Sequence, residues 1–442
     1  MSEKTRTDEF LLRGAWAHLT VLSLVETAMR ARPDKLNFRD AESMKDWSDQ
    51  IPHQATARSL SQMVTGFARQ MLSLGLKQGD PVLLAMPNQV DGVVALMGVM
   101  AAGFLPCPVS VVASSAQIQA AAEAVGARAI VTVNRYAHLS PSVQAREAAS
   151  RYYGIRFVCA FGPHSPEGIV ALDGWDEKEL WQGALPVIRP EMTALLTIDQ
   201  HPEGLVAHRR SHAQLISEGL ALSAVSGLTG RGTIIATFAP VSAAGVVSTV
   251  AAPLISGSAV TLHGPFDVAL LASQLNEQPS ALVVLPERIE TLVRKALPDQ
   301  LKDTIVIGRN NGAIKPAFKT ERVTELLALG EVALLPMVRD QSRAKQKLPR
   351  RFVHPVSTAL NPAMAQLECS VSDRGRLSLA GFGVATVYPA ETATHSDRVV
   401  ETRWLAHGDG PENISIMPDD EMQGVTDPQG FDDVGPLEIA AA

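Results

Sequence analysis

The sequence predicts an α/β fold in which two blocks of alternating strands and helices precede a small antiparallel β-subdomain. Short apolar strands alternate with amphipathic helices, at a spacing typical of βαβ units and a mostly parallel sheet. A loop-rich stretch over residues 161–189 interrupts this pattern, which then resumes. Beyond Pro349 the segments are short and alternate in polarity. We therefore divide the chain into subdomains over residues 1–189, 190–348 and 349–407, followed by an acidic extended tail over 408–442.

The helices of the first block follow from apolar side chains at three- and four-residue intervals. Residues 20–31 form one such segment, which Pro33 ends. Ser59 is placed to cap a second helix that runs to Leu74 and that Gly75 ends. Strands are expected over residues 81–86 and 129–133, helices over 91–102 and 116–125, a loop or edge hairpin over 40–56, and a proline-bounded turn over 106–109.

The second block repeats the pattern with apolar runs of four or five residues between helical segments. Its expected strands are 194–198, 233–237, 259–262, 281–285 and 304–308, and its expected helices are 211–225, 245–254 and 268–275. The alternating segments 367–371 and 376–379 indicate the antiparallel subdomain.

Composition excludes several classes of function. The 442 residues include 39 Lys and Arg and 46 Asp and Glu, for a formal charge of −7, without the basic clusters typical of nucleic-acid binding. No apolar run reaches the roughly 18 residues that a membrane span needs, and the N-terminal ten residues are polar and charged. The three cysteines form no C-x-x-C pair, so neither a disulfide framework nor a zinc ribbon is expected. We expect a cytoplasmic protein.

An ordered series of short motifs occupies residues 59–109: Leu74-Gly75, then Gly79-Asp80 before a strand, Pro87-Asn88 after it, and Ala102-Gly103 before the prolines. This series resembles the early region of adenylate-forming enzymes, the superfamily of acyl- and aryl-CoA synthetases, luciferases and peptide-synthetase adenylation domains. The resemblance continues through residues 240–257, which are similar to the family's substrate-pocket segment, and through 307–316, its adenine-side glycine turn with Gly312. It implies the fold of the large N-terminal domain of these enzymes.

The resemblance also implies a reaction, in which ATP and a carboxylate form an acyl-adenylate that then passes its acyl group to a thiol. In the family, a Gly-, Ser- and Thr-rich loop with a lysine holds the phosphates, because a triphosphate needs close backbone N–H groups and a cation. A glutamate after an aromatic-Gly turn helps to hold Mg²⁺, an aspartate binds the ribose, and a lysine from a mobile C-terminal domain completes the site.

The phosphate loop departs from this pattern. Counting back from Ser211-His212, residues 198–207 fall in its place and Val206 replaces the lysine. An alignment on Pro202 and Gly204 makes Glu203 the replacement instead. Either way the cation is lost, and Asp199 and Glu203 place negative charge where phosphates would lie. Because like charges repel, we expect this segment to disfavour ATP unless a metal ion intervenes.

Other family positions are also changed. The magnesium turn falls near residues 337–341 and ends in Gln341, and the segment 240–245 lacks the family's aromatic residue and histidine. Trp404-Leu-Ala-His-Gly-Asp409 matches the motif of the ribose aspartate, so Asp409 takes that place, although a simple Gly-Asp turn explains it equally well. No lysine and no Gly-Arg hinge follow Asp409, so the mobile C-terminal domain is expected to be absent.

Three further features are open to two interpretations. His208 and His212 stand four apart, the spacing of two zinc ligands on one helix face. No third ligand follows at a suitable spacing, so an exposed basic start to a helix is the favoured interpretation and no metal site is expected. Cys107 is a nucleophile or, as its apolar surroundings favour, a buried structural residue. The basic run over 343–351 is a solvated linker or a binding surface for an acidic acyl carrier protein.

Two functional hypotheses follow. The first is a degenerate, non-catalytic acyl-CoA synthetase-like protein without a certain cofactor, which binds an acyl-CoA, an acyl carrier protein or a catalytic partner subunit. The second is an active ligase with divergent ATP contacts, completed by a separate C-terminal domain; only this one requires ATP or AMP and Mg²⁺. The first predicts that Asp409→Ala leaves binding unchanged.

Overall fold

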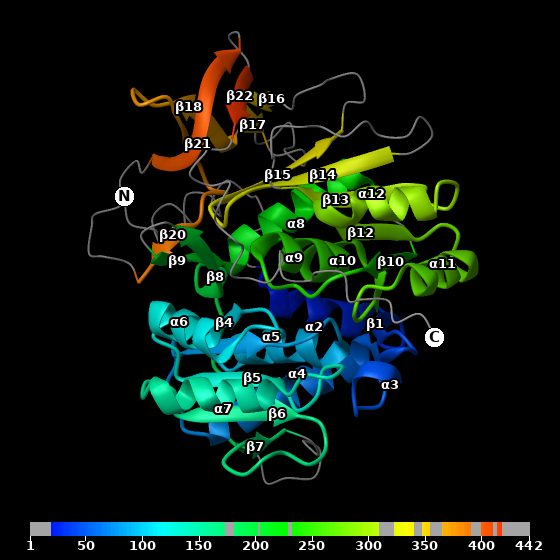
Figure 1. Cartoon of the computed structure of the whole chain (residues 1–442), viewed down its shortest axis with the longest axis vertical. Helices are drawn as coiled ribbons and strands as arrows, with labels where there is room; N and C mark the ends of the chain where they lie inside the picture. The colour runs from blue at the N-terminus through cyan, green and yellow to red at the C-terminus, as the bar shows by residue number, and fades with distance from the viewer. Residues whose placement is uncertain are drawn as a thin grey trace.

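The structure is a computed structural model of the chain. It describes residues 19–172, 181–201, 204–228, 232–308, 322–339, 347–353, 365–389, 399–409 and 413–417, to which all structural statements below refer. Two α/β units are stacked on each other, and an antiparallel sheet lies beyond the second unit (Figure 1). The predicted fold class is confirmed.

The first unit is a five-stranded parallel sheet in the order β4-β3-β5-β6-β7. β3, β5 and nearly all of β6 are buried, as expected of a parallel sheet covered on both faces. The proline-bounded turn predicted over 106–109 is wrong, because these residues contribute to strand β4, which pairs with β3 at the sheet edge, where proline is tolerated. The elements are β3 (Pro81–Ala85), β4 (Leu105–Pro108), β5 (Ala129–Val133), β6 (Phe157–Phe161), β7 (Val170–Ala171), α4 (Ala57–Ser73), α5 (Val90–Ala101), α6 (Ser115–Val125) and α7 (Pro141–Arg151).

The second unit is an eight-stranded sheet in the order β15-β14-β13-β12-β10-β11-β1-β2. Its edge strands β2 and β15 are antiparallel to their neighbours, and the strands between them are parallel. The elements are β1 (Leu36–Asp40), β2 (Gln54–Thr56), β10 (Thr233–Ala236), β11 (Ala259–Leu262), β12 (Leu282–Pro286), β13 (Asp303–Gly308), β14 (Arg322–Leu329), β15 (Ala333–Val338), α2 (Val21–Ala31), α3 (Met44–Trp47), α8 (His212–Ser226), α9 (Ala243–Val246), the π-helix η1 (Val247–Ala251), α10 (Ala252–Ser256), α11 (Val268–Glu277) and α12 (Glu287–Ala296).

The two units share strands and a core. β1 and β2 come from the N-terminal part of the chain but pair beside β11, so the sheets are interleaved across the limit that we placed at residue 189. Helix α2 contacts α4, α5, α8 and α10, and one hydrophobic cluster runs through both units. Every residue of α5 is buried, because this helix lies between layers.

Two smaller sheets complete the described fold. β8 (Thr193–His201), β9 (Gly204–Ser211) and β20 (Thr386–Tyr388) form a three-stranded antiparallel sheet. A six-stranded antiparallel sheet contains β16 (Lys347–Pro349), β17 (Arg351–Val353), β18 (Ala365–Val371), β19 (Arg376–Ala380), β21 (Val400–Asp409) and β22 (Asn413–Met417). This sheet extends past residue 407, where we expected the tail to begin; residues 418–442 lie outside the described part.

Helix ends follow local sequence rules. Thr20, Thr56, Ser114 and Ser211 each form a reciprocal capping box with the residue three positions later. Ser59, which we predicted as the N-cap of α4, is instead the third helical residue and bonds back to Thr56. Among the described residues no helix is both long and apolar enough to cross a membrane.

Candidate functional site

The segment that replaces the phosphate loop forms an antiparallel hairpin of β8 and β9. Its pairing runs from Thr193 opposite Ser211 to His201 opposite Gly204, and Pro202 and Glu203 lie outside the described residues. The other edge of β9 pairs with β20 over Ala207 to Arg209. Pairing between β8 and β9 engages backbone groups that a phosphate loop would turn towards its ligand.

The hairpin has one apolar and one polar face. Leu196, Ile198 and Ala207 are buried in a core cluster of the first unit. On the opposite face, Thr197 stands beside His208 and Asp199 beside Val206, as alternation along a strand requires. Val206, which the ungapped alignment puts in the place of the family lysine, therefore lies next to a carboxylate on the polar face.

Asp199 is fixed to the turn between β14 and β15. Its Oδ2 accepts a hydrogen bond of 2.6 Å from the backbone N–H of Glu331. Gly330 precedes this N–H with a φ of +57°, and a Cβ there would lie 2.5 Å from Oδ2. The close approach of the two segments therefore requires glycine at this position.

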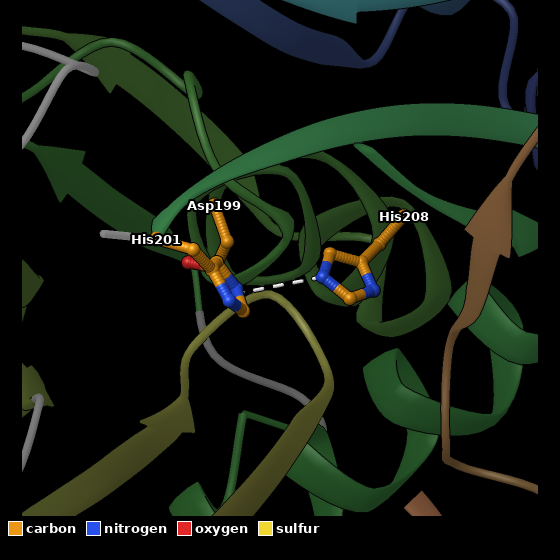
Figure 2. A group of neighbouring side chains, drawn as sticks. All are labelled: Asp199, His201 and His208. Carbon is orange, nitrogen blue, oxygen red and sulfur yellow. Dashed lines mark ion pairs between the residues drawn. The ribbon is translucent and has the colours of Figure 1, made fainter. Parts of the chain in front are cut away.

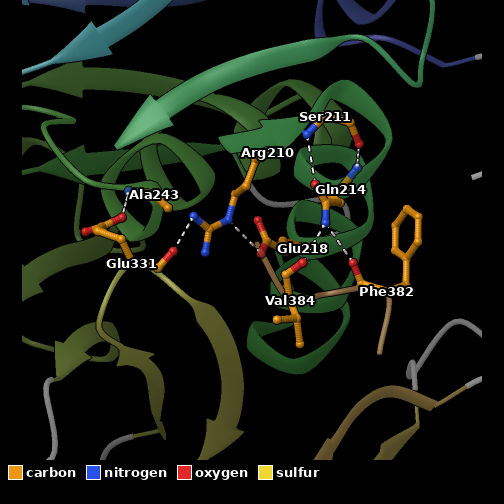
Figure 3. Close-up of polar contacts among 8 residues, drawn as sticks. All are labelled: Arg210, Ser211, Gln214, Glu218, Ala243, Glu331, Phe382 and Val384. Carbon is orange, nitrogen blue, oxygen red and sulfur yellow. Dashed lines mark hydrogen bonds and ion pairs between the residues drawn. The ribbon is translucent and has the colours of Figure 1, made fainter. Parts of the chain in front are cut away.

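Glu331 and Arg210 connect this turn to two helices, as Figure 3 shows. The Glu331 carboxylate accepts a hydrogen bond of 3.0 Å from the N–H of Ala243 at the start of α9, and its carbonyl accepts one of 2.9 Å from Arg210 Nη1. Arg210 Nε also lies 3.1 Å from Glu218 Oε1 on α8. Burial raises the pKa of Glu218, although the neighbouring Arg210 opposes this shift.

The same strand also positions the chain that leads into β20. Ser211 caps α8 together with Gln214, whose Nε2 donates to the carbonyls of Phe382 and Val384 at 2.9 and 3.1 Å (Figure 3). The hairpin, α8, the β14–β15 turn and the segment before β20 thus form one buried polar network.

Asp199, His201 and His208 converge on the polar face of the hairpin (Figure 2). One ligand-type atom from each lies within 4.8 Å of the others, and His208 Nε2 is 3.7 Å from Asp199 Oδ2. Both ring nitrogens of His208 are buried without a hydrogen-bond partner, and burial lowers its pKa to about 4. We did not single out His201; the alternation of Thr197, Asp199 and His201 was the signal that could have identified it.

His208 and His212 do not share a helix face, so that interpretation is wrong. Helix α8 begins at His212 because Ser211 is its N-cap, and His208 belongs to β9. The alternative, an exposed basic start to a helix, is also wrong, since both histidines and Arg210 are buried. His212 Nδ1 accepts a hydrogen bond from the Val21 N–H, and burial lowers the pKa of this histidine to about 3.

The described part of the magnesium turn contains a buried arginine. Arg339 follows β15 and donates to both carboxylate oxygens of Glu290, at 2.5 and 3.1 Å. Its Nε lies 3.5 Å from Glu325. Asp340 and Gln341 lie outside the described residues.

In the substrate-pocket segment the small residues are buried, and a Cβ on Gly245 would lie 2.9 Å from the Cα of Pro240.

The remaining predicted positions are described only in part. Asp409 is the last residue of β21 and pairs with Asn413, while its side chain, like the whole of Gly312, lies outside the described residues. Only residues 347–351 of the basic run are described. Cys107 is fully buried and burial raises the pKa of its thiol, which supports the structural interpretation.

The N-terminal part of the chain is similar in sequence to known enzymes. Residues 25–196 match the family of AMP-binding enzymes. Over 84 residues the chain is 37% identical to a long-chain-fatty-acid–CoA ligase of Escherichia coli and 36% identical to that of Salmonella typhimurium. Each match covers 19% of this chain and only 15% of the ligase.

Solved structures share the fold over nearly the whole chain. MbtA of Mycobacterium smegmatis, in its apo form, has a TM-score of 0.71 at 19% identity, with 94% of this chain and 78% of MbtA covered. A fatty acyl CoA synthetase of Mycobacterium tuberculosis has a TM-score of 0.69 at 13% identity, with coverages of 90% and 78%. O-succinylbenzoate Coenzyme A synthetase of Bacillus subtilis, in complex with AMP, has a TM-score of 0.65 at 12% identity, with coverages of 90% and 98%.

The chain therefore has the fold of the large N-terminal domain of adenylate-forming enzymes, and the predicted resemblance is confirmed. The sequence similarity to AMP-binding enzymes extends over residues 25–196.

Proposed function

We propose that this chain is a non-catalytic member of the adenylate-forming superfamily, which binds an acyl ligand or a protein partner and does not itself form acyl-adenylates. The observation that carries the proposal is the β8–β9 hairpin, whose polar face carries Asp199, a residue that the sequence alignment puts in the phosphate loop.

The hairpin lacks what a triphosphate needs. A phosphate site requires backbone N–H groups that face the ligand, together with a cation. Here β9 pairs with β8 along its length and also with β20 over Ala207 to Arg209, and the ungapped alignment puts Val206 in the place of the lysine. The Asp199 carboxylate is held in place by the Glu331 N–H, so an approaching phosphate meets fixed negative charge.

The charge network after β15 supports the same conclusion. Arg339 is engaged by Glu290 and Glu325, so its guanidinium is already neutralised by buried carboxylates. Releasing it for a nucleotide would leave those carboxylates buried without a partner, at a cost of several kcal/mol.

Acyl-CoA is the first ligand to test, because the local sequence similarity is to long-chain-fatty-acid–CoA ligases. An acyl carrier protein or a catalytic homologue is the alternative partner. We take acyl-CoA as the ligand of the proposal and treat the proteins as further candidates.

Calorimetric titration with ATP–Mg²⁺, AMP and a long-chain acyl-CoA tests the proposal, followed by carboxylate-dependent pyrophosphate exchange. We expect no saturable nucleotide binding, no exchange, and acyl-CoA binding that is unchanged in Asp409→Ala. The Escherichia coli ligase serves as the positive control for exchange. Micromolar ATP binding with exchange would overturn the proposal in favour of an active ligase completed by a separate domain.

A matched variant distinguishes two causes of inactivity, namely the missing lysine charge and the altered backbone conformation of the phosphate loop. Val206→Lys restores the family cation without changing the strand pairing of β9. We expect it to remain without exchange activity, because the paired backbone still cannot surround the phosphates. Exchange activity in Val206→Lys would instead locate the defect in a single side chain.

A further inference from the structure

The polar face of the β8–β9 hairpin brings together two imidazoles and a carboxylate from one short stretch of the chain. Asp199 and His201 lie on β8, and His208 lies on β9. Figure 2 shows the His208 ring directed across the hairpin towards the other two side chains. The ligand-type atoms of all three lie within 4.8 Å of one another.

Buried polar atoms on this face lack partners. His208 is 3% exposed, and neither of its ring nitrogens has a hydrogen-bond partner among the described residues. Thr197 Oγ1, on the residue that pairs with His208, is also buried without a partner. Buried polar groups in native proteins are nearly always satisfied, so an ion or water is needed to account for these atoms.

We propose that Asp199, His201 and His208 form a binding site for a divalent transition-metal ion. Imidazole nitrogen and carboxylate oxygen are ligands that Zn²⁺ and its neighbours accept, whereas Mg²⁺ prefers oxygen alone. Three protein ligands leave at least one coordination position for water or a small ligand.

The geometry is close to that of a metal site. Ligand atoms around a tetrahedral Zn²⁺ are separated by about 3.3 Å, given metal–ligand distances of about 2.0–2.1 Å. His208 Nε2 and Asp199 Oδ2 are 3.7 Å apart, so these two need only a small adjustment. His201 is partly exposed at the end of β8, and its ligand atom lies within 4.8 Å of those of the other two residues.

The surroundings orient the ligands as outer contacts do in known metal sites. The Glu331 N–H holds the Asp199 carboxylate through a hydrogen bond of 2.6 Å, and Gly330 permits that approach. Strand pairing fixes the two backbones that carry the three side chains. The site is thus built by the hairpin that replaces the phosphate loop, and it does not depend on the proposed function.

Titration of the untagged, chelator-treated protein with Zn²⁺ and with Co²⁺ tests the proposal. We expect one ion per chain, with calorimetry for Zn²⁺ and visible absorption of a nitrogen- and oxygen-coordinated Co²⁺ ion as readouts. Asp199→Asn and His201→Ala should each weaken binding by about tenfold or more, as should His208→Ala.

His201→Ala is the informative variant because His201 is only partly buried, so its loss should leave the fold intact, which circular dichroism will check. His138→Ala, at an exposed histidine outside the cluster, is the matched control and should bind like the unaltered protein. Absence of stoichiometric binding overturns the proposal, as does binding that His201→Ala and Asp199→Asn leave unchanged. Nucleotide binding is measured separately by the ATP–Mg²⁺ titration and the exchange assay, so failure here is distinguishable from failure of the proposed function.

Discussion

Arg210 and Glu218 form an ion pair of 3.1 Å in which the two side chains are only 1% and 2% exposed. The pair joins β9 to α8, and the same guanidinium reaches the Glu331 carbonyl in the β14–β15 turn. Arg210 therefore attaches the hairpin to the second unit, together with the hydrogen bond from the Glu331 N–H to Asp199. In such a pair, the attraction between the two charges offsets the large cost of removing both from water. Removal of one partner therefore leaves the other charge buried without compensation.

Arg210→Met should destabilise the protein by about 3–5 kcal/mol, since it leaves the Glu218 carboxylate without its cation. Urea unfolding measures the change. The exposed pair of Arg58 and Asp34, at 3.3 Å, offers a matched control, for which Arg58→Met should cost less than about 1 kcal/mol. The double variant Arg210→Met/Glu218→Leu should recover most of the loss. Equal costs for Arg210→Met and Arg58→Met would show that the buried pair does not hold the hairpin.

Two helical glycines in the first unit should respond in opposite ways to alanine. A Cβ on Gly98 of α5 would lie 2.5 Å from Phe67 Cδ1, and the Phe67 ring stacks on Phe161 and cannot easily retreat. A Cβ on Gly66 of α4 would have no atom within 4 Å. We expect Gly98→Ala to destabilise by about 1–3 kcal/mol and Gly66→Ala to stabilise by about 0.5–1 kcal/mol, as judged by denaturant unfolding. A stabilising Gly98→Ala would contradict the packing of α4 on α5.

Asp40 should make the stability of the protein fall as pH rises from about 4 to 7. Its carboxylate accepts hydrogen bonds from the Val90 and His53 N–H groups, yet burial raises its pKa to about 7, with nearby Asp91 acting in the same direction and His53 opposing it. Between the unfolded pKa, about 4, and the folded pKa, the native state binds a proton that the unfolded state has released. Its stabilising contribution is therefore complete below about pH 4 and is lost by about pH 7.

The measurement is the free energy of unfolding of the unaltered protein minus that of Asp40→Asn, followed from about pH 4 to 8. This difference should decrease by up to about 4 kcal/mol with rising pH. The test is the change of this free-energy difference with pH, because the asparagine side chain of the variant does not titrate. The value of the difference at any single pH also contains effects of the substitution other than titration. A difference that is constant or that increases with pH would refute the raised pKa.

Local sequence patterns were sufficient for the parallel units, because their strands are continuous apolar runs and their helices carry capping residues and terminal glycines. β5 and β12, and the helices around α5, were predicted within a residue or two. Helices α7 and α12 were not predicted, since their polar residues obscure the periodicity. Strands β14 and β15 were not predicted either, although they are mainly apolar. In α12, for example, Glu290 is buried only because Arg294 and Arg339 pair with it.

The sequence predicted which residues of the candidate site depart from the family pattern, but not how their side chains are arranged in space. Asp199 and Val206 were identified by position, whereas the burial of His208 and Arg210 depends on Glu218 and on the distant turn at Glu331. A polar strand face that is covered by segments more than a hundred residues away has no local signature. For this reason the sequence predicts an altered loop where the structure has a hairpin.

Zn²⁺ should raise the temperature of thermal unfolding if the three-residue site on the hairpin binds it. An ion that binds only the native state stabilises by about 2.7 kcal/mol at a hundred times its dissociation constant, which corresponds to a rise of a few degrees. Mg²⁺ at the same concentration should have little effect, because two of the three ligands are nitrogen. The rise should be reversed by a chelator and retained in His138→Ala. In His201→Ala it should fall to about half or less, because binding that is about tenfold weaker leaves about half of the stabilising free energy at the same Zn²⁺ concentration. A rise that His201→Ala leaves unchanged would place the stabilising ion outside the cluster of Asp199, His201 and His208.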